Sequence, residues 1–204
     1  MSTDPDKELL LILASSSPRR RAILESLGAS FSVMSADVDE RPLPNESPVE
    51  MVQRLAVAKA KAVARQCADH ALVLGADTAV VLGNEVFGKP EDEGDALRML
   101  SALSGRAHKV YTGVALVADG SVSTTVSSTE VQFREIRPDE ARRYWHSGEP
   151  RGKAGAYAIQ GSGGLFVESI MGSYSGVVGL PVFETAALLG AAGFQLLPEP
   201  ASGA

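Results

Sequence analysis

The stretch that decides the fold is Leu9-Leu10-Leu11-Ile12-Leu13-Ala14-Ser15-Ser16-Ser17-Pro18-Arg19-Arg20-Arg21. Its first six residues are apolar and predict a strand, and Ser17 followed by Pro18 predicts the start of a helix that extends to Leu27. A strand that ends in hydroxyls, then a helix N-terminus, then arginines is the layout of an anion site, because helix N–H groups and guanidinium groups both favour phosphate. The alternative is an ordinary capped helix start with solvated arginines, since three consecutive arginines cannot all face one way.

Outward from this stretch, strand and helix patterns alternate along the chain. The apolar run 71–82 is interrupted only by Asp77 and Thr78, and it predicts a central strand buried on both faces. Further strands are expected at 31–34, 86–87 (after a hairpin turn at 83–84), 110–117, 124–135 and 165–170, and helices at 48–66, 91–103, 138–147 and after Pro181. Because these elements follow no strict βαβ repeat, the predicted class is α/β or α+β with a mixed sheet.

Composition limits the classes of function. The chain has 204 residues, 45% hydrophobic and 22% charged, which excludes wholesale disorder. A net charge of -6 argues against nucleic-acid and membrane-surface binding, so an anionic ligand requires a local concentration of Arg and Lys. Cys67 is the only cysteine, which excludes an intrachain disulfide, and we expect a cytoplasmic protein. We expect one domain over 9–197, with disordered termini at 1–8 and 198–204.

Two charged side chains fall where the pattern is apolar. An unpaired Asp77 inside a buried strand would cost several kcal/mol, so it is expected to bind a metal, pair with a cation or act as a base. The alternative is an Asp at a strand end that caps a loop. Lys59 lies seven residues after Val52 and four before Val63, within the apolar stripe of the helix 48–66. It must therefore reach a buried anion or extend its ammonium group to solvent.

Two other segments carry weaker signals. Asp37, Asp39 and Glu40 form an oxygen-rich group of the kind that suits Mg²⁺ or Mn²⁺, and the alternative is a solvated run of charge. The segment Gly83–Lys89 spells the start of a Walker A loop, but the next residue is a proline where that motif needs a hydroxyl. This excludes a P-loop and leaves Lys89 as a candidate phosphate ligand in its own right.

Taken in order, the motifs of the chain resemble the Maf family from about residue 9 to 195. They are Leu11–Arg20, Asp39-Glu40, Gly75–Thr78, Gly88-Lys89-Pro90, Leu103-Ser104-Gly105, Thr112-Gly113, Lys153–Tyr157, Ile159-Gln160-Gly161, Gly172-Ser173-Tyr174 and Val178–Pro181. Maf proteins are nucleoside triphosphate pyrophosphatases, related in fold to inosine triphosphatases, and are often also described as septum-formation inhibitors. The resemblance implies an elongated mixed sheet with flanking helices, forming two lobes around a nucleotide cleft, and a homodimer.

The resemblance also implies a role for individual residues. It assigns Asp77 as the proton acceptor for the attacking water and, with Glu40, as a ligand of Mg²⁺ or Mn²⁺. It places on the phosphates Ser15, Arg20, Lys59 and Lys89. Three positions that face the base distinguish the subtypes of the family, and the residues there, Arg19, Thr78 and Gln160, are those of the dTTP/UTP pyrophosphatases. The expected substrate is therefore a pyrimidine nucleoside triphosphate, ordinary or modified.

Two other functions stay open from the sequence. One is a nucleotide-binding regulator of cell division that does not turn its ligand over. A pure binder of a polyanion gains nothing from Asp77 and Glu40 beside phosphate, which argues against it. The other is a pyrophosphatase for a different base, such as 7-methyl-GTP or a non-standard nucleotide.

Overall fold

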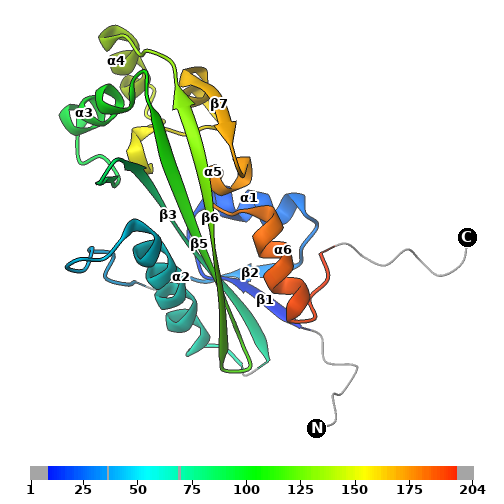
Figure 1. The fold of residues 1–204 in the computed structure, drawn as a ribbon. Coiled ribbons are helices and arrows are strands. Elements are labelled where there is room, and N and C mark those ends of the chain that lie inside the picture. Colours follow the sequence, from blue (N-terminus) through cyan, green and yellow to red (C-terminus); the bar gives the residue numbers. More distant parts are fainter. Residues whose placement is uncertain (1–8, 36, 69, 197–204) are drawn as a thin grey trace, which may run out of the picture.

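The fold is a seven-stranded mixed sheet, seen in a computed structural model that describes residues 9–35, 37–68 and 70–196 (Figure 1). The disordered termini predicted at 1–8 and 198–204 lie outside the described residues. The strands run β2-β1-β3-β5-β6-β7, and β4 pairs with β3. Their bounds are β1 Leu10–Leu13, β2 Phe31–Val33, β3 Ala71–Leu82, β4 Glu85–Phe87, β5 Ala107–Ala118, β6 Ser121–Phe133 and β7 Val167–Met171. The predicted mixed sheet is confirmed.

Helices cover both faces of the sheet and one of its ends. Their bounds are α1 Pro18–Ser26, α2 Pro48–Ala64, α3 Glu93–Leu103, α4 Pro138–His146, α5 Tyr174–Val178 and α6 Val182–Ala191, with short 3₁₀ turns η1 Ala154–Ala156 and η2 Ser162–Phe166. One core cluster gathers around α3 and α4, and others lie beneath α1, α2 and α6. The sequence did not predict α5, because five residues are too few to show a helical period. Among the described residues, no helix is long and apolar enough to cross a bilayer.

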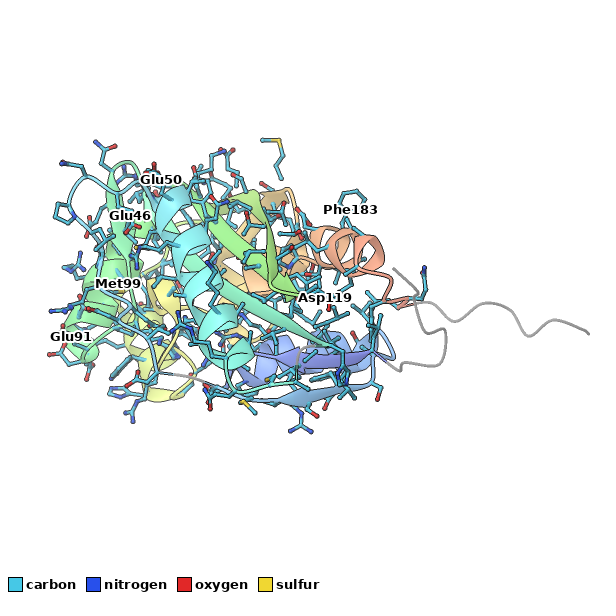
Figure 2. The ribbon with its side chains drawn as sticks, turned by 90° about the horizontal axis from the view of Figure 1, so that it is seen from below. Glu46, Glu50, Glu91, Met99, Asp119 and Phe183 are labelled. Atoms are coloured by element: carbon cyan, nitrogen blue, oxygen red, sulfur yellow. The ribbon has the colours of Figure 1, made fainter. Side chains whose placement is uncertain are left out.

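Helix α2 packs directly on β3 and β5, as the view from below shows (Figure 2). The helix begins with a capping box between Ser47 and Glu50. Two glycines in the sheet make the close approach possible. A Cβ at Gly75 would collide with the carbonyl oxygen of Ala56, and one at Gly113 would lie 2.5 Å from that of Val52.

A gap along one edge of β3 positions the functional residues. On this edge β1 pairs with β3 up to Leu13 and Leu74, and β4 begins to pair at Val80. Within the described residues, β3 positions 75–79 have no strand partner on that side, although β5 pairs with them on the other. The gap therefore leaves the middle of a central strand without a neighbouring strand, and Asp77 and Thr78 are half-buried there.

Candidate active site

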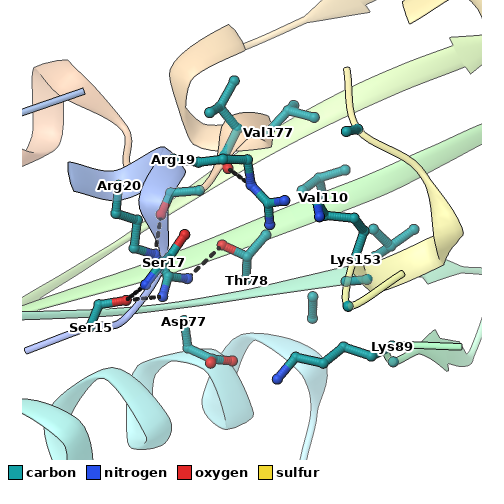
Figure 3. A pocket seen from close by; sticks show the side chains of 18 of the residues that line it. Ser15, Ser17, Arg19, Arg20, Asp77, Thr78, Lys89, Val110, Lys153 and Val177 are labelled. Atoms are coloured by element: carbon teal, nitrogen blue, oxygen red, sulfur yellow. Dashed lines mark hydrogen bonds between the residues drawn. The ribbon is translucent and has the colours of Figure 1, made fainter. Parts of the chain in front are cut away.

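A cavity of about 470 Å³ opens at this gap, within the range typical of small-molecule sites. The turn after β1 lines one side of it, and the segment after β4 together with η1 lines the other. Figure 3 shows Arg19 and Arg20 entering from one side, Lys89 and Lys153 from the other, and Asp77 between them. All nine residues that the sequence placed in the site line this cavity: Ser15, Arg19, Arg20, Glu40, Lys59, Asp77, Thr78, Lys89 and Gln160.

Ser15 and Arg20 form a fixed hydrogen-bond donor corner. The Ser15 hydroxyl oxygen accepts from the Ser17 backbone N–H at 3.2 Å and from Arg20 Nη1 at 3.1 Å. Both of its lone pairs are thus engaged, and its own proton remains to be donated to a ligand. Arg20 also donates to the Gly179 carbonyl at 2.7 Å and to the Thr78 hydroxyl at 3.3 Å. Burial lowers the pKa of Arg20 below its ordinary value. Arginine nevertheless stays charged in proteins at neutral pH.

The three consecutive arginines diverge, as expected. Arg19 donates to the Val178 carbonyl at 3.3 Å, Arg20 turns into the donor corner, and Arg21 pairs with the exposed Glu25. The solvated alternative therefore holds for one arginine only. Ser17 occupies the N-cap position of α1, but its side chain makes no capping hydrogen bond. Only the position of the predicted cap is correct.

Strand alternation sends Asp77 and Thr78 to opposite faces of β3. Thr78 lies opposite Thr112 of β5, and their hydroxyl oxygens are 3.0 Å apart. Because the Thr112 hydroxyl donates to the Gly176 carbonyl at 2.8 Å, the Thr78 proton must go to Thr112. Thr78 also accepts from Arg20. It can therefore offer a ligand only an acceptor lone pair.

On the α2 face, one ammonium group holds two carboxylates. Lys59 Nζ lies 2.7 Å from Asp77 Oδ1 and 2.6 Å from Glu40 Oε1. The prediction that Lys59 reaches a buried anion is confirmed, and the side chains of Lys59 and Asp77 are each only 13% exposed. Hydrogen bonding to Lys59 holds the pKa of Glu40 below its usual value. Lys89 approaches the other Glu40 oxygen at 3.5 Å.

Two carboxylates of the cavity, Glu40 and Asp77, have the donor chemistry of a divalent metal site. Glu40 and Asp77 already converge on one cation, and hard carboxylate oxygens are the donors that Mg²⁺ prefers. Among residues 9–35, 37–68 and 70–196, no group of three or more His, Cys, Asp or Glu side chains is placed to hold a metal ion. The suggested cluster of Asp37, Asp39 and Glu40 does not form as a ligand set, because Asp39 pairs with Arg41 at 2.6 Å on the surface. Its solvated alternative is confirmed for Asp39.

The far wall carries a cation that the sequence did not assign to the site. Lys153 immediately precedes η1 and lines the cavity. Its ammonium group donates to the Arg151 carbonyl at 3.1 Å. Burial, together with repulsion from Arg19, lowers the pKa of Lys153. The sequence contained a signal for it, since Lys153 opens the motif Lys153–Tyr157 that resembles the family.

Comparison with known proteins supplies the family. A family profile described as Maf-like protein matches residues 10–192. The chain belongs to the Maf family. Maf relatives include the "dTTP/UTP pyrophosphatase" of Hahella chejuensis, 51% identical over 188 residues that cover 91% of this chain and 94% of that protein. A protein of the same description from Anaeromyxobacter dehalogenans (strain 2CP-C) is 54% identical over 190 residues, covering 91% and 95%.

Two of the solved structures with some likeness to this Maf chain carry Ham1 titles. The Ham1 protein of Staphylococcus aureus aligns with a TM-score of 0.46 at 12% identity, over 61% of this chain and 71% of that one. The HAM1 protein of Coxiella burnetii aligns with a TM-score of 0.44 at 19% identity, over 62% and 73%.

Proposed function

We propose that this chain is a nucleoside triphosphate pyrophosphatase that hydrolyses dTTP and UTP to the monophosphate and pyrophosphate. The observation that carries the proposal is the pairing of Asp77 with Lys59 inside a cavity whose other walls present Arg20, Lys89 and Lys153. A carboxylate held by an ammonium group, among further cations, suits the removal of a proton beside a polyanion. The name "dTTP/UTP pyrophosphatase", carried by relatives about 50% identical to this chain, supports the same reaction.

Each residue of the site has a part in this proposal. Asp77 accepts the proton of the water that attacks the α-phosphorus, and Lys59 orients the carboxylate. The bond to the bridging oxygen breaks, and the pyrophosphate leaves with the bonding electron pair. Ser15, Arg20, Lys59 and Lys89 donate to the phosphate oxygens and offset the charge that develops on the leaving group.

A divalent cation, Mg²⁺ or Mn²⁺, is proposed to be held by Glu40 and Asp77 together with the substrate's phosphates. When bound it neutralises phosphate charge as a Lewis acid. Two protein carboxylates are the usual share in such nucleotide sites, where phosphates and water complete the coordination. The two carboxylates, each in contact with the ammonium group of Lys59, support this assignment.

Arg19, Thr78 and Gln160 are proposed to read the base. The hydrogen-bond state of Thr78 supports a pyrimidine with a ring N–H, because this hydroxyl has only an acceptor to offer. Thymine and uracil present that donor at N3, whereas cytosine presents an acceptor. We predict that replacing Thr78 with Val and Gln160 with Ala together lowers the ratio of dTTP to CTP turnover by about tenfold or more. An unchanged ratio contradicts the assignment.

We also propose a cytoplasmic homodimer. Edge strand β7 and its surroundings present large apolar side chains, among them Leu165 at 72% and Met171 at 69% exposed, and such surface suits association. Light scattering coupled to size-exclusion chromatography tests the dimer, with a monomer mass as the contrary result. Cell fractionation tests the compartment.

The reaction itself is tested by pyrophosphate release from dTTP, UTP, CTP, GTP, 7-methyl-GTP, ITP and a modified pyrimidine triphosphate, with Mg²⁺ or Mn²⁺. Metal-dependent release from dTTP and UTP supports the proposal. Faster turnover of a triphosphate with another base supports the proposed reaction but contradicts the proposed substrate. Binding with no release favours the regulator instead.

A further inference from the structure

Gln160 lies on a short turn that belongs to no helix or strand. The turn closes through a Gly161 N–H to Ala158 carbonyl hydrogen bond of 3.2 Å, between η1 and η2. Ala158 is buried at its base, and Gln160 is exposed at the rim of the cavity. Something beyond this one bond must therefore set the direction of the turn.

Two side chains from α4 and the loop after it hold the base of the turn on both sides. The Tyr144 hydroxyl accepts from the Ala158 backbone N–H at 3.0 Å and donates to Glu149 Oε1 at 2.7 Å. Glu149 accepts the backbone N–H groups of Ser162 at 2.9 Å and Gly163 at 3.0 Å. Three backbone amides that flank Gln160 are thus satisfied by one linked pair of side chains.

The ionisation of Glu149 and the packing of Tyr144 both favour these hydrogen bonds to the turn. Burial opposes ionisation of Glu149, but hydrogen bonds from Gly163, Tyr144 and Ser162 outweigh it and lower its pKa. The carboxylate therefore remains an acceptor at neutral pH. Tyr144 is 5% exposed, and its ring packs edge-on against Phe166, with ring centroids 5.1 Å apart, which fixes the position of its hydroxyl.

The glycines of the turn match the same two side chains. A Cβ at Gly161 would fall within 2.6 Å of Glu149 Oε1, and one at Gly163 would lie 2.5 Å from the Tyr144 hydroxyl. Both positions must lack a side chain for the carboxylate and the phenol to reach the backbone. The sequence Gln160–Gly163 is thus shaped to receive this pair.

We propose that Tyr144 and Glu149 are positioning residues for base selection, because they hold Gln160 at the rim of the cavity. The inference rests on the proposed base-reading role of Gln160. The pair itself lies behind the turn, and acts on the nucleotide through Gln160.

The test measures equilibrium binding of dTTP, CTP and inorganic tripolyphosphate in EDTA, where turnover plays no part. The variants are Tyr144→Phe, which keeps the ring packing, and Glu149→Gln. Their matched controls are Tyr174→Phe and Glu168→Gln, both on exposed side chains outside the cavity. A third variant, Gln160→Ala, is studied alone and combined with each of the first two.

We expect each positioning variant, like Gln160→Ala, to lower the dTTP preference over CTP by about tenfold, while tripolyphosphate binding changes by less than about twofold. In the Gln160→Ala background the positioning variants should add nothing further, because they act through that residue. A preference that survives in both positioning variants but is lost in Gln160→Ala overturns the inference. So does an equal loss of tripolyphosphate binding, or a wild-type chain with no preference. If the chain binds dTTP selectively but releases no pyrophosphate, only the proposed function is contradicted. The ratios of dTTP to CTP binding can still be measured and still test the positioning role.

Discussion

Replacing Asp77 with Asn removes the proposed proton acceptor while it keeps the size and shape of the side chain. The amide has an oxygen for Lys59, which lies 2.7 Å from the native carboxylate. It has no capacity to take a proton from water at neutral pH. General base catalysis contributes about 10²- to 10⁴-fold to a rate, so pyrophosphate release from dTTP should fall by at least about 100-fold.

The same substitution should cost little stability. A hydrogen bond to a charged partner contributes about 1.5–3 kcal/mol, and a neutral one about 1 kcal/mol, so the loss is about 0.5–2 kcal/mol. Lys59 keeps its 2.6 Å contact with Glu40, and no buried charge is left alone. In a chain of this size the melting temperature should fall by about 1–8 °C. Activity and stability therefore separate clearly.

The assay combines initial rates of pyrophosphate release with thermal melts of the same preparations. Asp119→Asn is the matched control, because Asp119 lies on the exposed turn between β5 and β6 with a φ of 46°, a conformation that asparagine tolerates. Figure 2 shows Asp119 at the opposite end of the molecule from Glu91. A folded Asp77→Asn variant within about threefold of the wild-type rate would refute the reasoning.

Three further predictions concern the core and the metal. Burial lowers the pKa of His108 to about 4, so stability is full above about pH 6.5 and falls by up to about 3 kcal/mol toward pH 4, as the unfolded chain takes up a proton that the folded one refuses. His108→Phe should flatten the melting temperature over that range, and parallel curves would contradict this. Gly75→Ala should destabilise the chain by about 1–3 kcal/mol, because the added Cβ would collide with α2. Gly190→Ala is the control, since nothing lies within 4 Å of its added Cβ, and it should not destabilise the chain. Equal melting temperatures of the two variants would contradict this prediction. EDTA should stop pyrophosphate release without lowering the melting temperature, and added Mg²⁺ or Mn²⁺ should restore the release. Pyrophosphate release that continues in EDTA would contradict the proposed metal requirement.

Periodicity predicted the parts of the site that depend on a single element. The helical period placed Lys59 on the buried face of α2, and the apolar run placed Asp77 inside β3, so their contact was within reach of the sequence. The strand predicted at 71–82 is confirmed residue by residue, because the apolar run continues on both sides of Asp77 and Thr78 up to the turns that bound it.

Contacts between distant segments were outside the reach of the sequence. Arg20 is held by the carbonyl of Gly179, 159 residues away, and any backbone carbonyl can serve as such an acceptor. The support of the Gln160 turn by Tyr144 and Glu149 was missed for a similar reason, since a tyrosine and a glutamate near a helix end have no distinctive pattern. The residues around Glu40 gave only a weak indication of a metal site, because such an acidic group can equally be a solvated run of charge. The proposed role of Glu40 in particular therefore came from the resemblance.

In the proposed reaction, water attacks the α-phosphorus of dTTP in this cavity. Turnover in H₂¹⁸O, followed by mass spectrometry of the products, tests it most directly. We expect dTMP that carries one ¹⁸O atom and pyrophosphate that carries none. Labelled pyrophosphate, or the formation of dTDP and orthophosphate, would contradict it.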